Sequence, residues 1–382
     1  MSRHNFEIPV VFTHRIVFTR NAFAPENPHL ADILLEGGGR RACAFIEHAV
    51  AAAWPGLAAA VPAYFAPLAV DFCGSTVLPG GEASKADEAL VRQVWETLDQ
   101  ARIDRHSYVL AIGGGAFLDA VGFATATAHR GVRLLRFPTT TLSQDDGGVG
   151  VKCAINGYGK KNWIGTFAVP FAVINDFEFL SSQDPDNCRA GLIEAVKVAL
   201  VKDPAFFSWI EDHLPALAAL DPECLETCVE RSALLHAGHI ASGGDAFESG
   251  SSRPLDFGHW AAHKLESLTA YQLPHAPAVS VGLALDTLYS AHSGQLAAAA
   301  AERILRVLDA LQLATYHPAL EWRDESGRRQ VFAGLDEFRE HLGGQLTVLL
   351  LQDLGVGLNV HHMNEPLLDQ CIDELRQRAA QY

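Results

Sequence analysis

The chain has 382 residues, and 49% of them are hydrophobic, which is enough to fill the cores of two globular domains. Its formal net charge of −16 opposes nonspecific binding of nucleic acid, because phosphates gain affinity from basic surfaces. The first residues, MSRHNFEIPVVFTHRIVF, mix charges into an apolar segment unlike a secretory signal, and no stretch near twenty residues is continuously apolar. Seven scattered cysteines favour reduced thiols, so we expect a cytoplasmic protein that binds neither nucleic acid nor membrane.

The first half of the chain alternates short apolar runs with helical patterns. Strands are predicted at 41–50, 106–115 and 132–141, with helices at 87–102 and 117–130 between them. This order predicts an α/β fold in which helices cover a largely parallel, Rossmann-like sheet. We therefore assign an α/β domain to residues 1–180.

From about Asp184 onward the patterns are mainly helical. A strand is expected only late, at 346–355. We assign a mainly α-helical domain to residues 181–382. Its predicted helices are 186–203, 224–240, 253–268, 277–292, 295–313 and 365–382.

A glycine-rich turn, Gly113-Gly114-Gly115, joins the strand at 106–115 to the helix that follows it. Without β-carbons the backbone can approach a pyrophosphate, and the start of the helix offers unpaired amides. The spacing is not the usual G-x-G-x-x-G, and a purely structural turn would also explain it. Asp119 has two interpretations as well, a ligand-binding residue or a first-turn carboxylate that stabilises the helix dipole.

Polar side chains accumulate in residues 137–165, where a buried strand should end. Lysines and amides among small residues suit phosphate or sugar hydroxyl groups, although a solvated glycine-rich loop is the simpler alternative. The residues of interest are Thr139, Thr140, Asp146, Lys152, Asn156, Lys160, Lys161 and Asn162.

Three metal-ligand candidates lie on the predicted helices of the second half. Glu194 shares a helix face with Lys197 among apolar residues, so the pair is either an exposed ion pair or a buried carboxylate that needs a cation. His259 and His263 are one turn apart, and His275 opens the next helix. A carboxylate with two imidazoles, Glu194, His259 and His275, supplies three ligands and leaves room on a divalent metal.

Read in order, these segments resemble the 3-dehydroquinate synthase family of sugar phosphate cyclases. The resemblance runs from about Arg41 to Leu351 and implies a nucleotide-binding domain, a helical metal-binding domain, a catalytic cleft between them and a homodimer. Its motifs are PGGEASK at 79–85, GGGAFLDAVGFATATAHRG at 113–131, PTTTLSQDDGGVGVK at 138–152, GKKN at 159–162, IEAVK at 193–197 and LDFGHWAAH at 255–263, followed by the His275 helix.

The resemblance implies roles for individual residues. Glu194, His259 and His275 would bind zinc, with cobalt as an alternative. Residues that would contact NAD are Glu47, Glu82, Lys85, Gly114, Gly115, Asp119, Thr139, Thr140, Asp146, Lys161, Phe179 and Ser182. Residues around the reacting substrate would be Asp146, Lys152, Asn162, Lys197, His263, Arg253 and Asp256, with Arg130 lent by the partner subunit to the phosphate.

The activity implied by the resemblance is a redox-assisted cyclisation. A ring hydroxyl is oxidised transiently, phosphate is eliminated, the hydride returns, and the opened chain closes to a carbocycle. Two alternatives stay open: a metal-dependent alcohol or glycerol-phosphate dehydrogenase with the same two-domain plan, and a noncatalytic ligand-binding regulator. The lysines at 152, 161 and 197 favour the cyclase.

Several departures from the family pattern bear on the substrate. Asp256 stands where the family has asparagine, and Arg253 is one residue away from the usual carboxylate-binding arginine. An upstream lysine is missing, with His236 or His239 in its region, and Arg339-Glu340 replaces a lysine pair near the C-terminus. A substrate carboxylate gains most from fixed cations, so we expect sedoheptulose 7-phosphate, as in valiolone-type cyclases, ahead of 3-deoxy-arabino-heptulosonate 7-phosphate.

Overall fold

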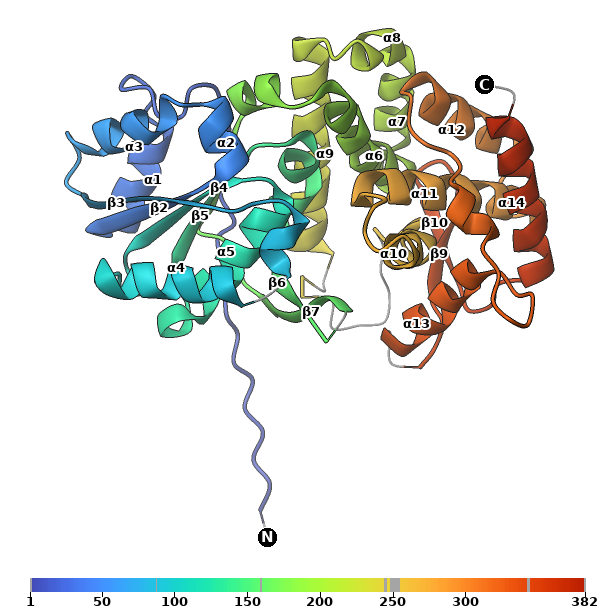
Figure 1. Ribbon diagram of the computed structural model, residues 1–382, viewed down its shortest axis with the longest axis horizontal. Coiled ribbons are helices and arrows are strands. Elements are labelled where there is room, and N and C mark those ends of the chain that lie inside the picture. The colour runs from blue at the N-terminus through green and yellow to red at the C-terminus, as the bar shows by residue number, and fades with distance from the viewer. Residues whose placement is uncertain are drawn as a thin grey trace. The chain divides into compact units, whose positions relative to one another are not determined.

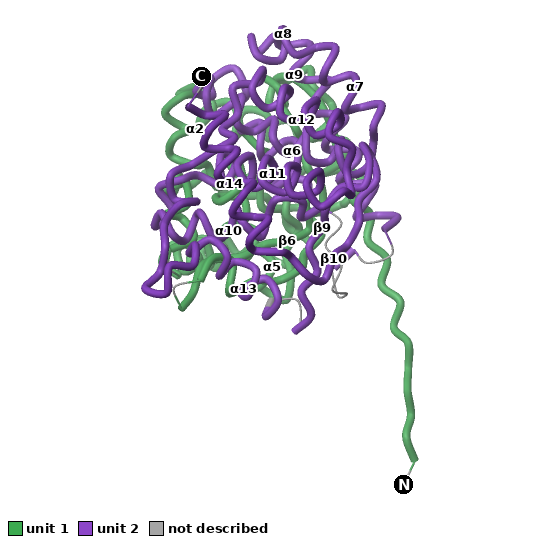
Figure 2. The backbone as a smooth tube through the Cα atoms, turned by 90° about the vertical axis from the view of Figure 1, so that its right-hand side faces the viewer, with its two compact units in different colours: residues 1–139, 150–178 green, residues 140–149, 179–382 purple. Residues whose placement is uncertain are grey.

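A computed structural model describes residues 2–86, 88–158, 160–243, 246–247, 255–341 and 344–380. The chain forms two compact units, which Figure 2 shows in different colours. Unit 1 comprises residues 1–139 and 150–178, and unit 2 comprises residues 140–149 and 179–382. The ten residues 140–149 therefore group with the helical second half.

Unit 1 is built on a six-stranded parallel sheet with the order β1-β8-β5-β4-β2-β3. The central strand β4 is continuously apolar because helices cover both faces of the sheet, and all six of its residues are buried. The predicted α/β fold is thereby confirmed. The strands are β1 (Ile16–Thr19), β2 (Arg41–Glu47), β3 (Asp71–Leu78), β4 (Tyr108–Gly113), β5 (Arg133–Pro138) and β8 (Ala172–Asp176).

The helices of unit 1 lie on the two faces of this sheet, with α4 and α5 on the face opposite α1 and α3 (Figure 1). On one face of the sheet, Phe45 of β2 and Val109 of β4 belong to the same buried cluster as Val94 of α4 and Phe117 of α5. The helices are α1 (His29–Gly37), α2 (His48–Ala53), α3 (Leu57–Phe65), α4 (Ala89–Gln100) and α5 (Gly115–Thr127), with 3-10 turns η1 (Glu82–Lys85) and η2 (Ala128–Arg130).

An antiparallel hairpin, β6 (Lys152–Gly157) with β7 (Lys160–Phe167), occupies the lysine-rich segment of unit 1. The sequence analysis predicted a ligand-binding segment, with a solvated loop as the alternative, and no strands there. Alternation is weak in both strands, since the burial of β7 changes between exposed and intermediate positions without an apolar face.

Unit 2 is mainly helical, and α11 lies at its centre (Figure 1). Residues Ala278 to Ser290 of α11 are all buried, and the helix contacts α6, α10, α12, α14 and β9. A helix that is apolar on every side belongs in a core. The helices are α6 (Pro185–Lys202), α7 (Pro204–Asp212), α8 (Leu214–Ala218), α9 (Pro222–Ser242), α10 (His259–Leu268), α11 (His275–His292), α12 (Ala298–Ala310), α13 (Ala333–His341) and α14 (Glu365–Ala379).

Short turns and a hairpin complete unit 2. The expected late strand is β9 (Val348–Asp353), which pairs with β10 (Val356–Val360). A π-helical turn, η3 (Ser143–Gly147), and 3-10 turns η4 (Phe177–Ser182), η5 (Pro318–Glu321) and η6 (Gln330–Phe332) lie between the longer elements. Along the described residues no helix has the length and apolar character to cross a bilayer.

One predicted helix begins later than expected. The sequence pattern predicts a helix along residues 253–268, whereas α10 starts at His259. Gly258 sets this start, because its φ of +80° is a left-handed conformation outside a helix. A β-carbon there would also lie 2.5 Å from the backbone nitrogen of Leu283, so glycine lets α10 begin directly against α11.

Candidate functional site

Glu194 lies on α6 inside a run of buried residues from Gly191 to Val201. Its carboxylate forms an ion pair with Lys197, one turn along the helix, and the side chains are 1% and 4% exposed. Apart from this ion pair, neither oxygen of Glu194 has a hydrogen-bond partner among the described residues. The interpretation of Glu194 and Lys197 as an exposed ion pair is therefore wrong. The buried Glu194 carboxylate can still accept a bond from a cation.

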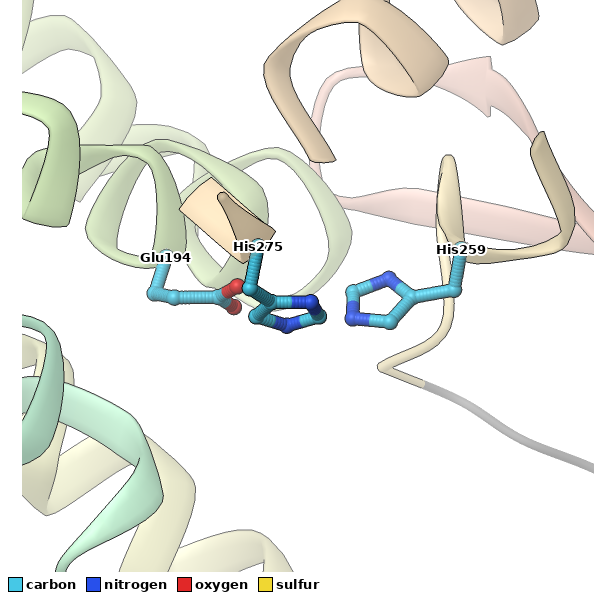
Figure 3. A group of neighbouring side chains, drawn as sticks. All are labelled: Glu194, His259 and His275. Carbon is cyan, nitrogen blue, oxygen red and sulfur yellow. The ribbon is translucent and has the colours of Figure 1, made fainter. Parts of the chain in front are cut away.

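His259 and His275 bring their rings to this carboxylate. One ligand atom from each of Glu194, His259 and His275 lies within 4.8 Å of the others. Figure 3 shows the carboxylate and the two rings turned toward one another, and the ring centroids of His259 and His275 are 5.6 Å apart. Each histidine is the first residue of its helix, and the start of α10 packs against Gly282 and Leu283 in the middle of α11.

The charge state of His259 suits a metal ligand. Burial, together with the charges of Lys197 and the neighbouring histidines, holds the pKa of His259 well below its usual value. A neutral imidazole keeps a free lone pair, which is what a metal requires.

Two buried carboxylates hold the histidines in place. Oε2 of Glu266 lies 3.2 Å from Nδ1 of His275. Asp286 on α11 accepts hydrogen bonds from the Gly258 backbone amide at 3.0 Å and from Nε1 of Trp260 at 2.8 Å, on either side of His259. Such contacts fix the orientation of a metal-binding ring.

The sequence interpretation missed both supporting carboxylates. Glu266 follows His259 by seven residues and His263 by three, so it shares their helix face. Asp286 is a single carboxylate within the apolar run VGLALDTLYS, and burial raises its pKa to about 7. Either pattern could have revealed a buried carboxylate near the metal ligands. A second group of potential ligands, His263, Glu266 and His275, shares His275 with the first.

Asp146 lies in the π-helical turn η3, and its carboxylate forms an ion pair with His236 of α9. Burial alone would raise the pKa of Asp146, but the charges of His236 and Lys197 outweigh it and hold the pKa far below its usual value. For Lys197, burial is likewise outweighed by the carboxylates of Glu194 and Asp146, so its pKa is raised. Asp146 is therefore ionised and Lys197 is charged at neutral pH.

Asp145, which the sequence interpretation did not single out, is fully buried beside Asp146. Burial and the charges of Asp146 and Glu194 raise its pKa well above the usual value, and neither of its oxygens has a hydrogen-bond partner among the described residues. A further negative charge beside Asp146 and Glu194 is unfavourable, so the Asp145 carboxyl group holds its proton more tightly than usual.

In unit 1, Glu47 connects the glycine turn to the PGGEASK segment. Its Oε2 accepts from the Gly114 amide at 2.7 Å and its Oε1 from the Gly81 amide at 2.8 Å. A β-carbon on Gly80 would lie 1.8 Å from Oε1 of Glu47, so only glycine allows this approach. The carboxylate thus fixes two glycine segments at the ends of β2, β3 and β4.

The other predicted NAD residues of unit 1 lie near this turn or on its strands. Lys85 forms a 2.7 Å ion pair with Asp119 of α5, and its side chain is 3% exposed. Lys161 lies 3.8 Å from Glu82. The Thr139 amide donates to the Gly113 carbonyl at 3.1 Å, which ties the end of β5 to the glycine turn.

The remaining predicted residues are placed individually. In unit 2, Thr140 hydrogen-bonds Ser143, Phe179 is buried, and Ser182 donates to the Phe179 carbonyl at 2.9 Å. In unit 1, Lys152 and Asn162 lie exposed on the hairpin, and the Asn156 side chain accepts a hydrogen bond from the Asn162 amide at 3.0 Å. Nζ of Lys160 lies 4.6 Å from the ring centroid of Trp163. Arg130 is exposed and has a φ of +65°. His263 is exposed on α10.

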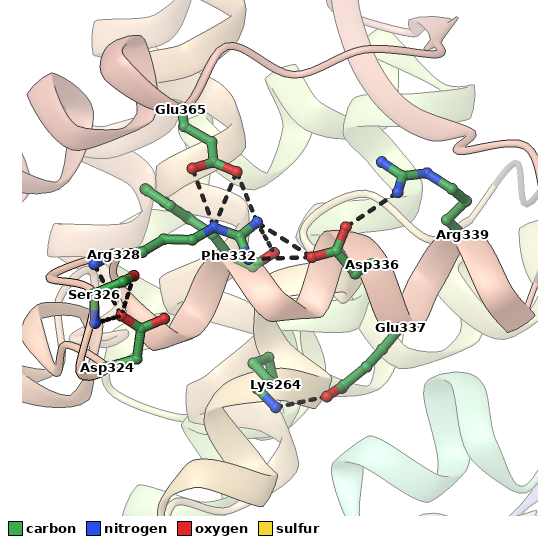
Figure 4. Close-up of polar contacts among 9 residues, drawn as sticks. All are labelled: Lys264, Asp324, Ser326, Arg328, Phe332, Asp336, Glu337, Arg339 and Glu365. Carbon is green, nitrogen blue, oxygen red and sulfur yellow. Dashed lines mark hydrogen bonds and ion pairs between the residues drawn. The ribbon is translucent and has the colours of Figure 1, made fainter.

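The positions that depart from the family pattern differ in what surrounds them. The Asp256 carbonyl accepts from the His259 amide at 3.0 Å, and the Asp256 charge contributes to the raised pKa of Lys197. Arg253 lies outside the described residues. Arg339 donates to Asp336 on its own helix at 3.1 Å, and Arg328 links Asp336 to Glu365 (Figure 4). Arg339 is thus part of a surface ion-pair network.

Comparison with known proteins identifies the family. Family models of the N-terminal and C-terminal parts of 3-dehydroquinate synthase match residues 75–190 and 191–327. The chain is also 36% identical over 282 residues to a 3-dehydroquinate synthase of Halorhodospira halophila, covering 74% of this chain and 77% of that protein. The chain belongs to the 3-dehydroquinate synthase family. The predicted family and the prediction of an enzyme are confirmed.

Solved structures of two synthases share the fold of nearly the whole chain. A 2-epi-5-epi-valiolone synthase from Streptomyces hygroscopicus, solved with NAD+ and Zn2+, superposes with a TM-score of 0.87 at 27% identity, covering 98% of this chain and 100% of the other. A 2-deoxy-scyllo-inosose synthase superposes with a TM-score of 0.77 at 20% identity, covering 94% and 96% of the two chains. These superpositions confirm the fold predicted for the chain.

Proposed function

We propose that this member of the family is a sugar phosphate cyclase that uses NAD and a divalent metal, and that converts a seven-carbon sugar phosphate to a carbocycle with loss of phosphate. The observation that carries the proposal is the buried group of Glu194, His259 and His275 beside an ionised Asp146 and a charged Lys197. Three metal ligands and two charged groups around one point suit a polyhydroxylated substrate.

The metal would be held by Glu194, His259 and His275, with zinc or cobalt as the candidates. The buried oxygens of Glu194, which lack hydrogen-bond partners among the described residues, and the neutral His259 fit a divalent ion. When bound, such an ion orients substrate oxygens and stabilises negative charge on them. The 2-epi-5-epi-valiolone synthase, with Zn2+ bound, supports this assignment.

NAD would bind in unit 1 at the glycine turn. Gly115 opens α5, and the first-turn amides of a helix favour a pyrophosphate, while the Glu47 carboxylate fixes the turn through the Gly114 amide. NAD supplies a reversible hydride acceptor for a ring hydroxyl. The adenosine and nicotinamide contacts of the other predicted residues, including Phe179 and Ser182, remain part of this proposal.

The charged side chains would divide the work on the substrate. Lys197 and Asp146 would bind hydroxyl groups and move protons, since both are held ionised in a partly buried setting. Lys152, Asn162 and His263 would hold the phosphate. We also propose a homodimer in the cytoplasm, in which the exposed Arg130 reaches the phosphate bound by the partner subunit.

Sedoheptulose 7-phosphate is the substrate that we favour. A substrate carboxylate would meet the carboxylate of Asp256, and Arg339 is already paired with Asp336. The close superposition on the 2-epi-5-epi-valiolone synthase along the whole chain supports this choice. The second candidate is the 3-dehydroquinate synthase reaction on 3-deoxy-arabino-heptulosonate 7-phosphate, which the 36% identical relative favours.

A turnover assay tests the proposal. Purified protein with NAD and Zn2+ or Co2+ is incubated separately with each heptulose phosphate, and released phosphate, carbocyclic product and total NADH are followed. We expect phosphate release from sedoheptulose 7-phosphate with no net NADH, and loss of release in Glu194→Gln. Release only from the 3-deoxy acid would establish the second candidate. Net NADH would indicate a dehydrogenase, and NAD and metal binding without turnover would indicate a regulator.

A further inference from the structure

Helix α9 contacts the π-helical turn η3 through two side chains on one face. The Ser232 hydroxyl donates to the Asp145 carbonyl at 3.2 Å in a buried position. His236, one helical turn later on the same face, contacts Oδ1 of Asp146 through Nδ1. The helix therefore holds both the backbone and the carboxylate of this turn.

Lys197 does not fix the Asp146 carboxylate in the same way. It makes its contact with Glu194 on its own helix, and its influence on Asp146 is through charge. The imidazole of His236, by contrast, is in direct contact with one oxygen of Asp146 and sets the orientation of the carboxylate. The His236 side chain is 16% exposed, so water competes little for this contact.

The turn itself makes such support necessary. A π-helical turn is a single widened turn, and such turns occur frequently at functional sites. In η3 it places Asp146 where the charge of Lys197 acts on its pKa. Without the contacts from α9, the Asp146 carboxylate would gain rotational freedom, and its position relative to the substrate would be less well defined.

We propose that His236 is a positioning residue that fixes the Asp146 carboxylate for its contact with a substrate hydroxyl group. The inference rests on the proposed function, since it assigns the residue that prepares Asp146 for that reaction. The sequence left His236 and His239 as equal candidates in this region, and the structure places His236 against Asp146.

Three variants test this role. His236→Gln places a neutral hydrogen-bond donor at this position, and His236→Lys places a cation there. His292→Gln is the matched control, because it removes a 2.8 Å histidine–carboxylate contact with Glu374 at the surface. The side chains of His292 and Glu374 are 42% and 40% exposed. His292 ends α11, about 25 Å along the helix from His275 at 1.5 Å per residue.

We expect His236→Gln to lower kcat/KM for sedoheptulose 7-phosphate on the order of 10- to 100-fold. His236→Lys should recover part of this loss, and His292→Gln should match the wild type. Binding of Zn2+, measured by calorimetry, should be unchanged in all three. Wild-type kcat/KM in His236→Gln, or equal impairment in His236→Lys, would overturn the proposal.

A double-mutant cycle separates this inference from the proposed function. Urea unfolding of His236→Gln, Asp146→Asn and the double variant needs no substrate. If His236 holds Asp146, the double variant is destabilised by clearly less than the sum of the singles, whereas additive losses would refute the contact. A wild-type enzyme that turns over neither heptulose phosphate would refute the proposed function and leave the cycle as the measure of the contact.

Discussion

Asp286 supports the metal ligand His259 from a neighbouring helix, and Asp286→Asn tests that support. The carboxylate accepts from the Gly258 amide at 3.0 Å and from the Trp260 indole at 2.8 Å. An asparagine has one acceptor oxygen, and its amide nitrogen would face the second donor, so one buried N–H would lose its partner. Leaving a buried donor unpaired costs about 1–3 kcal/mol of the free energy of unfolding.

The same substitution should weaken metal binding. Gly258 and Trp260 flank His259, so a shift of either displaces its ring, and loss of a residue that supports a metal ligand typically costs about 10- to 100-fold in affinity. Zn2+ affinity is measured by competition with a chelator and stability by urea unfolding of the metal-free protein. Asp212→Asn, exposed at the end of α7, is the control. Unchanged stability and Zn2+ affinity in Asp286→Asn would refute this role.

The pKa of Asp286 adds a dependence on pH. Burial raises its pKa from 3.8 to about 7 in the folded protein, so between these values the folded state keeps a proton that the unfolded state has lost. The contribution of this group to the free energy of unfolding is therefore present at low pH and falls as pH rises toward 7, by at most about 1.4 kcal/mol per pH unit. Asp286→Asn should destabilise the metal-free protein more at pH 5 than at pH 7. An equal loss at both would contradict the shift.

Two further predictions concern the glycine turns and the buried ion pair. Gly80→Ala should displace the Glu47 carboxylate at a cost of about 1–3 kcal/mol in the free energy of unfolding, and should weaken NADH binding measured by fluorescence. The control is Gly56→Ala, which should be tolerated because a β-carbon there meets nothing within 4 Å. Equal effects of the two substitutions would refute the role of the close approach between Gly80 and Glu47. Lys197→Met should lower the free energy of unfolding of the metal-free protein, measured by urea unfolding, by about 3–5 kcal/mol, because Glu194 loses its buried cation. A loss below about 1 kcal/mol, as for an exposed ion pair, would contradict this prediction.

Much of the site could be predicted from the sequence because its residues lie in local motifs. The strand, glycine turn and helix around Gly114 follow from periodicity and from the absence of β-carbons. The metal ligands Glu194, His259 and His275 follow from the residue types and from the resemblance, and the structure brings their ligand atoms together. These are features that neighbouring residues set by themselves.

Long-range packing decided the rest. Spacing on α6 could not tell a buried Glu194 from an exposed one, because burial depends on which helices cover that face. The support of His259 by Asp286 arises only because Gly258 lets α10 start against α11. His236 and His239 are alike in sequence, and the packing of α9 on the turn at Asp146 distinguishes them. The sequence by itself determined which side chains can do the chemistry; the tertiary structure decided which of them meet, because helix faces acquire neighbours only when the chain folds.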